Sequence, residues 1–330
     1  MENTKSNERR QSRFLAFFTG STFKALLPFL GLVLIVVGMN ILTGGKLLTP
    51  KRIRLLLSQV YYPAIVATGV FFIMTLGSID FTEGSTLGVA SIVISVISTR
   101  LDSLGALAIP LAILGGILTG AAIGAFNGFV HVKFKLPSFI VTICTMYLFR
   151  GVCAYLTTET AVPASSAIKA LDEDWIKITV TLAVLAIAFF LFQFTRIGTD
   201  VKAVGSGETA ARFSGVRTNR VKFLAFVAAG ALTGLAAFVN VIKVGSITST
   251  AGNQLETQIL ISLVLGGLPI TGGAKVRFSN IIVGTLMYTV LNNGLVMLGF
   301  ESATQQLIKG LVFLLFVALT IDRKALKVIK

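Results

Sequence analysis

Long apolar runs separated by short polar segments dominate this sequence. Several runs exceed the roughly 18 apolar residues that mark a membrane-spanning helix. The second and third runs are separated by the polar stretch GSIDFTEGS, which is compatible with a broken or re-entrant arrangement. The pattern therefore predicts an all-α, polytopic membrane protein with about ten spans, near residues 25–42, 59–77, 84–100, 104–130, 137–156, 175–194, 221–243, 256–270, 279–298 and 304–320.

Composition agrees with this fold class. Of 330 residues, 54% are hydrophobic and only 13% are charged, so most side chains must face lipid or other apolar helices. No polar segment is long enough for a soluble domain. We expect one transmembrane domain over 25–320, with an inner loop at about 195–220 and cytoplasmic tails at 1–24 and 321–330.

The formal charge of +15 does not indicate nucleic-acid binding, because the bases are spread between the apolar runs. Such a distribution is typical of topology signals, in which Lys and Arg mark cytoplasmic loops. Most of the 29 bases fall on the inner side if the N-terminus is cytoplasmic, and an even number of spans then returns the C-terminus to the cytoplasm. The exceptions form an outer basic cluster of Lys46, Lys51, Arg52 and Arg54.

Two of the predicted helices carry glycines four residues apart. This spacing places the glycines on one helical face, where the backbone of another helix can approach closely. The sequence therefore predicts close helix packing at Gly116, Gly120, Gly124 and Gly128, and at Gly230 and Gly234.

Polar residues inside apolar runs are candidates for a translocation path. Asp80 and Glu83 either line such a path or are exposed to water in an inner loop, and the sequence favours neither interpretation. Arg150, in the middle of a span, is expected to pair with a carboxylate or to extend to the interface. Each further candidate is by itself more typical of an interhelical hydrogen bond: Asn127, Glu256, Gln258, Asn292 and Asn293.

Motifs for catalysis or nucleotide binding are not apparent in the sequence. GGLPITGGAK superficially resembles a phosphate loop, but Gly273 and Ala274 separate Gly272 from Lys275, and Val276 stands where a hydroxyl residue is needed. We interpret this stretch as a Gly-rich turn at the inner membrane face. The single histidine, His131, has no evident metal-ligating or catalytic partner and is expected at the membrane interface.

One inner segment, GSGETAARFSG at 205–215, has the composition of a short helix with an acid near its start and a base near its end. Its small residues would allow another protein's surface to approach the backbone closely. The segment is therefore a candidate docking surface on the cytoplasmic side, although composition alone suits an ordinary amphipathic loop equally well.

Six stretches of the chain, in order, resemble the permeases of ribose-type ABC sugar importers. RIGTDVKAVGSGETAARFSGVRTNRVK is similar to that family's signature inner loop, and GSIDFTEGS is similar to its G-I-D-L-S-V-G-S. The other four are LPSFIVTICTMYLFRG, LETQILISLVLGGLPITGG, LNNGLVMLG and IKGLVFLLFVALTIDRK. The chain departs from the family pattern at Ser78, Glu83, Asp200, Gly207 and Gln258.

The resemblance implies a type II ABC importer-like bundle in a bacterial inner membrane. A separate cytoplasmic ATPase would use ATP and Mg²⁺, an extracytoplasmic binding protein would deliver the sugar, and a second permease copy or paralogue would complete a dimer. The chain itself would bind no cofactor and catalyse no reaction. Its coupling contact with the ATPase would involve Gly205, Glu208, Ala210, Ala211, Arg212, Ser214 and Gly215.

The implied substrate is a simple sugar or a related polyol, in the class of ribose, xylose, galactose or autoinducer-2. Two other functions are considered beside it. An ion-coupled secondary transporter would use Asp80 and Glu83 as its coupling pair. A structural membrane scaffold would transport nothing.

Overall fold

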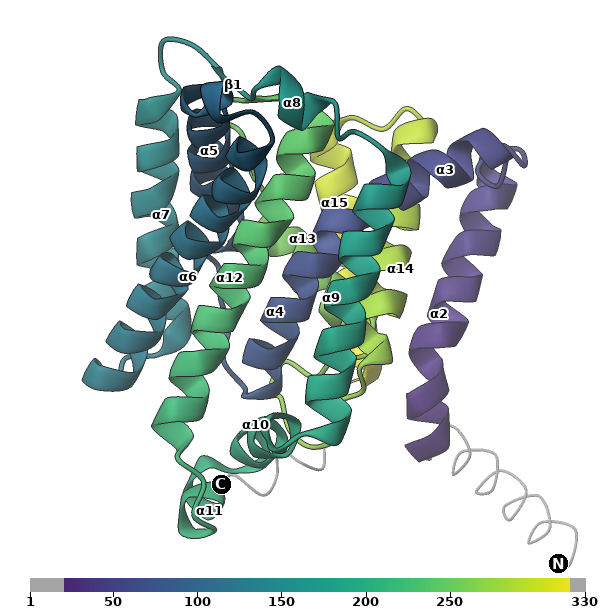
Figure 1. Cartoon of the computed structure of the whole chain (residues 1–330). Helices are drawn as coiled ribbons and strands as arrows, with labels where there is room; N and C mark the ends of the chain where they lie inside the picture. The colour runs from purple at the N-terminus through teal and green to yellow at the C-terminus, as the bar shows by residue number, and fades with distance from the viewer. Residues whose placement is uncertain (1–20, 321–330) are drawn as a thin grey trace, which may run out of the picture.

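The computed structural model describes residues 21–320 as a helical bundle (Figure 1). The predicted tail at 321–330 and residues 1–20 of the other tail lie outside the described residues, and the first helix of the described part begins at Ser21 rather than near residue 25. The helices are α2 (Ser21–Leu42), α3 (Pro50–Ser58), α4 (Tyr61–Thr75), α5 (Glu83–Arg100), η1 (Asp102–Leu107), α6 (Ala108–Phe134), α7 (Ser138–Leu156), α8 (Ser166–Lys169), α9 (Asp174–Phe194), α10 (Arg196–Ser206), α11 (Glu208–Phe213), α12 (Thr218–Val244), α13 (Leu255–Leu265), α14 (Ser279–Met297) and α15 (Ser302–Thr320).

Each of the ten predicted spans coincides with one helix of the described chain, and the boundaries differ by a few residues. Within residues 21–320, five helices are long and apolar enough to cross a membrane, and α3 with α4, bent by 43°, would make a sixth. The described parts of α2, α13 and α15 are apolar but shorter. The helical membrane class is thus confirmed, whereas the number of ten spans stays a prediction.

The predicted glycine packing is confirmed where α6 lies against α12. A Cβ atom added to Gly120 would lie 2.0 Å from the carbonyl oxygen of Gly230, and one added to Gly116 would lie 3.2 Å from that of Gly234. Only hydrogen at these positions allows the two backbones to touch. Such close contact is an important source of helix association, because apolar burial gives helices little driving force to associate in lipid.

Two irregular segments enter the bundle, and both begin at a glycine that ends a helix. Gly77 follows α4 with a φ of 77°, and Gly245 follows α12 with a φ of 68°. The second segment touches the first turn of α5, since a Cβ atom on Gly84 would lie 2.2 Å from the carbonyl oxygen of Gly252. Irregular backbone at membrane depth requires protein partners. The Ile79 amide, for example, donates to Ser138 Oγ of α7 at 3.0 Å.

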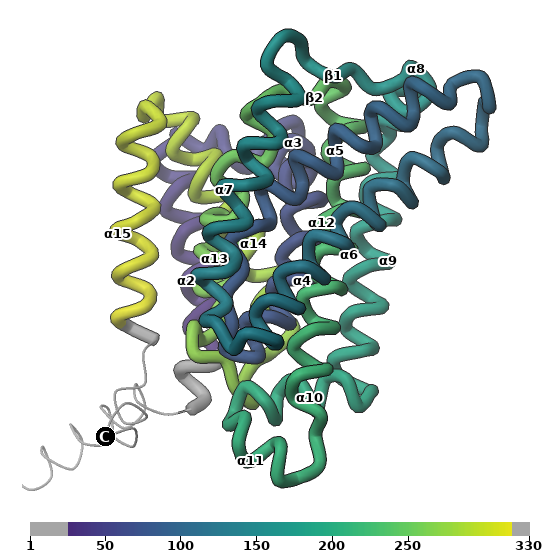
Figure 2. The backbone as a smooth tube through the Cα atoms, turned by 90° about the vertical axis from the view of Figure 1, so that its left-hand side faces the viewer, coloured from purple at the N-terminus to yellow at the C-terminus, as the bar shows by residue number. Residues whose placement is uncertain are grey.

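The two ends of the bundle differ in structure (Figures 1 and 2). One end carries α3, α8 and a short antiparallel ribbon, in which β1 (Val162–Pro163) pairs with β2 (Ser246–Ile247). The other end carries α10 and α11, which link α9 to α12. We call these the ribbon end and the α11 end.

Candidate functional site: the α11 end and a polar pocket

The segment 205–215 folds as parts of two helices rather than as one. Gly205 and Ser206 are the last residues of α10, Gly207 separates the two helices, and α11 follows. Gly215, with a φ of 88°, lies just beyond the end of α11, as expected for a glycine that terminates a helix. The prediction of a short helix is confirmed, but Gly205 does not belong to it.

Ala211 points towards the protein's own interior. It is only 4% exposed and lies in a small apolar cluster with Ile73, Leu76 and Val204. Ala211 therefore does not lie on the outer face of α11 in this structure, and its part in the coupling contact stays a prediction. Its methyl group instead attaches α11 to the bundle, which explains why a small apolar residue stands there.

The exposed residues of this segment include Glu208, Ala210, Arg212, Ser214 and Gly215 from the predicted set. Sequence reasoning missed Phe213, which is 84% exposed at the end of α11. Aromatic side chains, phenylalanine among them, are enriched in protein–protein interfaces, which makes Phe213 a candidate anchor for a partner protein. The signal was present in the sequence, because Phe213 is the one aromatic residue in a run of small and polar ones.

Glu208 fixes α11 to the start of α12. Its carboxylate lies 2.5 Å from the Lys222 ammonium group, and this hydrogen bond lowers the pKa of Glu208 below its ordinary value. The carboxylate is therefore charged at neutral pH and the ion pair persists. Because the Glu208 side chain is 46% exposed, water screens the pair, and its main effect is to orient α11.

Gly205 connects the α11 end to the broken helix α4. A Cβ atom at Gly205 would lie 1.9 Å from the Thr75 carbonyl oxygen, so α10 touches the last residue of α4 directly. The same oxygen accepts a hydrogen bond of 3.0 Å from the Gly273 amide. The Gly-rich turn predicted at 266–275 therefore joins α10 and α4 at one point.

Asp80, Glu83 and Asn127 form a buried polar group where the chain enters α5. Asp80 and Glu83 are 2% and 1% exposed, so the interpretation of both as wet loop acids is wrong. Asp80 accepts hydrogen bonds from the Thr82 amide and hydroxyl at 2.8 and 2.6 Å, and Asn127 Nδ2 donates to the Thr82 hydroxyl at 3.0 Å. These bonds hold the irregular segment in place.

Glu83 reaches a different helix. Its carboxylate accepts a hydrogen bond from the Thr233 hydroxyl of α12, while its second oxygen has no hydrogen-bond partner among the described residues. Neither Asp80 nor Glu83 is paired with a base in the described part of the chain. Glu83 ties α5 to α12, Asp80 holds Thr82 at the start of α5, and neither residue lines the two pockets described below.

Arg150 pairs with a carboxylate, as predicted. Its guanidinium lies 3.4 Å from Glu256 and also donates to the carbonyl oxygens of Ala251 and Gly252 at 3.1 and 3.3 Å. Glu256, another path candidate, is therefore committed to an ion pair that joins α7 to the start of α13. Removing one partner of such a pair would leave an uncompensated charge in a poorly solvated place.

A polar pocket of about 220 Å³ lies between α4, α13 and α14. It brings together Gln258 and Asn292, and Asn293 lies behind it, with Nδ2 donating to Gln59 Oε1 at 2.7 Å. No feature of the sequence linked these positions. The lining residues are Gln59, Tyr62, Lys243, Gln258, Tyr288, Thr289 and Asn292.

The chemistry of this pocket suits a neutral polyol. Side-chain amides and hydroxyls both donate and accept hydrogen bonds, as sugar hydroxyls require, and no carboxylate lines the pocket. The volume is below the roughly 300–1,000 Å³ of pockets for drug-sized ligands, which indicates a smaller solute.

Comparison with known proteins identifies the family. Residues 52–317 match the family described as branched-chain amino acid transport system / permease component. The chain is 31% identical to the ribose import permease protein RbsC of Escherichia coli strain K12, over 91% of this chain and 93% of the relative. It is 33% identical to RbsC of Bacillus subtilis, over 90% and 92%.

A relative with a different cargo matches almost as widely. The autoinducer 2 import system permease protein LsrC of Enterobacter sp. strain 638 is 28% identical over 89% of this chain and 88% of its own length. No solved structure matches the chain significantly. From the extent of the family match, this chain belongs to the branched-chain amino acid transport system / permease component family.

Proposed function

We propose that this chain is the membrane permease subunit of an ABC importer for a simple sugar or a related small polyol. The observation that carries the proposal is the similarity, across about nine-tenths of the chain, to proteins named as ribose and autoinducer 2 import permeases. L-arabinose and D-allose permeases are also among the relatives. The chain's own features, a projecting α11 and a small polar pocket, agree with this role.

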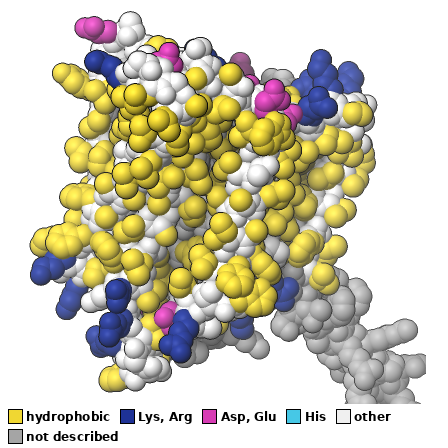
Figure 3. Space-filling model, in the orientation of Figure 1, with side chains coloured by type: hydrophobic (Ala, Val, Ile, Leu, Met, Phe, Trp, Pro, Cys, Tyr) yellow, Lys and Arg dark blue, Asp and Glu magenta, His cyan; other side chains and the backbone are white. Residues whose placement is uncertain are grey.

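In the proposed arrangement the α11 end faces the cytoplasm of a bacterium, the chain crosses the inner membrane ten times, and both termini are cytoplasmic. The bases near this end support the orientation, and Figure 3 shows several of them below the apolar band. They include Lys133, Lys135, Arg196, Arg212, Arg217, Arg220 and Lys275.

The energy for transport would come from another polypeptide. A cytoplasmic ATPase dimer would bind ATP and Mg²⁺ and move α11, and a second permease copy or paralogue would form the other half of the gate. An extracytoplasmic binding protein would deliver the sugar to the ribbon end. The permease would alternate between openings to the two sides without covalent chemistry of its own.

Reconstitution tests this function against ion-coupled transport. Liposomes containing the chain, its ATPase and its binding protein should accumulate one member of a panel of ribose, arabinose, allose and autoinducer-2 only when ATP is present. Liposomes with the chain alone and a proton or sodium gradient should accumulate none. Uptake by the chain alone would overturn the proposal in favour of a secondary transporter.

The polar pocket is the proposed stopping point of the sugar. Replacing Gln258 with leucine should raise the KM for uptake about three- to tenfold, because one neutral hydrogen bond contributes about 0.5–1.5 kcal/mol. The matched control is Gln306→Leu, the same change at an exposed position of α15. Equal KM values for Gln258→Leu and the native chain would remove this pocket from the path, without affecting the assignment as a permease.

A further inference from the structure

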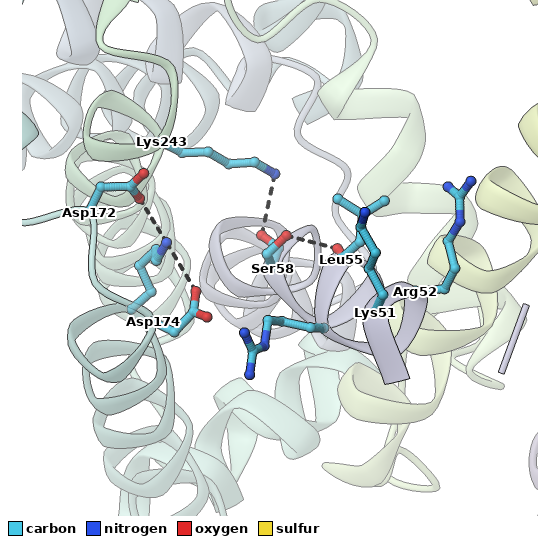
Figure 4. A pocket seen from close by; sticks show the side chains of 9 residues that line it. Lys51, Arg52, Leu55, Ser58, Asp172, Asp174 and Lys243 are labelled. Atoms are coloured by element: carbon cyan, nitrogen blue, oxygen red, sulfur yellow. Dashed lines mark hydrogen bonds and ion pairs between the residues drawn. The ribbon is translucent and has the colours of Figure 1, made fainter. Parts of the chain in front are cut away.

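A second, larger pocket opens at the ribbon end and contains most of the outer basic cluster. Its volume is about 580 Å³, and it lies between α3, the start of α9 and the end of α12. In Figure 4, Asp172 and Asp174 lie on one side of it and Lys51 and Arg52 on the other. The lining residues are Lys51, Arg52, Arg54, Leu55, Ser58, Asp172, Asp174, Lys177 and Lys243.

The positive charges in this pocket outnumber the negative ones. Both carboxylates are engaged by a single base, because Lys177 Nζ lies 2.8 Å from Asp172 and 3.3 Å from Asp174. Lys243 Nζ donates to the Ser58 carbonyl oxygen at 3.3 Å. The three bases of α3, at positions 51, 52 and 54, form no ion pair with any described residue. The pocket therefore attracts an anion.

Helix α3 presents this charge beside an apolar surface. Residues 51, 54, 55 and 58 recur at helical spacing and line the pocket, while Ile53 and Leu57 on the same short helix are 41% and 43% exposed. Figure 3 shows a group of Lys and Arg side chains at the upper right, directly above the apolar band that faces lipid. Ile53 and Leu57 do not line the pocket, but Leu55 does and is 41% exposed, so an anion bound here would have an apolar side chain next to it.

Trp175 indicates the depth of the pocket in the membrane. It follows Asp174 directly, and its side chain is 66% exposed on the first turn of α9. Exposed tryptophan at the end of a spanning helix is typical of the headgroup region of a bilayer. Ile178, one turn further along α9, is 38% exposed, which is consistent with contact with acyl chains.

We propose that this pocket binds the phosphate headgroup of an anionic phospholipid, with the acyl chains lying along Leu55 and Ile178. Basic side chains at headgroup depth favour anionic lipids. An acidic protein surface would satisfy the charge but would leave the adjacent apolar side chains exposed. The inference explains why bases accumulate at the end where the topology rule disfavours them, and it does not depend on the proposed transport function.

The single tryptophan allows a direct test on the full chain. In liposomes, phosphatidylglycerol brominated on its acyl chains should quench Trp175 with an apparent affinity at least about fivefold above that of brominated phosphatidylcholine, since each base near the surface contributes about fivefold. Replacing Lys51, Arg52 and Arg54 together with glutamine should reduce this preference to nearly onefold. Lys243 stays unchanged because it also lines the polar pocket.

The control is a triple replacement of equal charge at the other end, Lys133→Gln, Lys135→Gln and Arg277→Gln, which should keep the preference. Unchanged Trp175 emission without brominated lipid shows that a variant is folded.

Equal quenching by the two lipids in the native chain would overturn the proposal. The proposal would also be overturned if millimolar inorganic phosphate abolished the preference for phosphatidylglycerol, because the site would then bind a free anion. Retained lipid preference in the triple variant, together with lost uptake from the binding protein, would assign the cluster to protein docking instead.

Discussion

Replacing Gly205 with alanine is expected to reduce ATP-driven uptake by more than about tenfold while the ATPase still binds. The new Cβ atom would lie 1.9 Å from the Thr75 carbonyl oxygen and 3.0 Å from the Gly273 amide nitrogen, so backbone must move against backbone. Tightly packed contacts between helices switch between a few distinct arrangements and do not deform gradually, so a small displacement here can block the switch. A movement of α11 would then no longer be transmitted through α10 to the end of α4.

Gly207 provides a closely matched control two residues away. An alanine Cβ there meets nothing nearer than the Ala210 Cβ at 3.9 Å, and the φ of 166° is extended backbone that alanine accepts. Uptake and ATP hydrolysis would be measured in parallel for Gly205→Ala and Gly207→Ala, with thermal unfolding as a check on the fold. Native uptake by the Gly205 variant would show that this contact transmits nothing.

Replacing Phe213 with alanine is expected to weaken binding of the ATPase at least about tenfold, and uptake should fall with it. A buried aromatic anchor in an interface commonly contributes 2 kcal/mol or more. In the isolated permease Phe213 packs against almost nothing, so its removal should leave the unfolding temperature unchanged. Affinity would be measured by titrating labelled ATPase onto the reconstituted permease.

Phe134 is the appropriate comparison for that experiment. It is also a largely exposed phenylalanine, 62% open, but it ends α6 and does not belong to α11. Phe134→Ala should keep native affinity and uptake. If both variants bind the ATPase like the native chain, α11 is not the docking element. If both lose affinity equally, the contact covers the whole α11 end rather than resting on one anchor.

The positions of the apolar helices were predictable because hydropathy is a local property, whereas the polar helices α3, α8 and α10 were not predicted. An apolar run must satisfy its backbone hydrogen bonds internally in lipid, so its length alone predicts a helix. The packing of α6 on α12 was predictable for a similar reason, since glycines four residues apart mark one helical face wherever the partner comes from. The pairing of Arg150 followed from the cost of an unpaired charge at that depth.

The functional geometry was less accessible from the sequence. Ala211 and Phe213 stand two residues apart in the same short helix, yet one faces the interior and the other faces solvent. Composition suggested a docking surface but not which face of α11 it occupies. That depends on how α10 and α12 place α11, which is decided by contacts with residues more than a hundred positions earlier, such as Ile73.

The sequence by itself determined that this chain is a helical membrane protein, where its apolar helices lie, and which family it resembles, because these depend on short-range pattern and motif. Only the tertiary structure decided how the polar residues are distributed. It placed Asp80 and Glu83 in hydrogen bonds and Glu256 in an ion pair, at the starts of α5 and α13. It also brought Gln258 and Asn292 together in one pocket. The physical reason is that a buried polar group takes whichever partner the packing brings within hydrogen-bond reach, and that partner is usually remote in sequence.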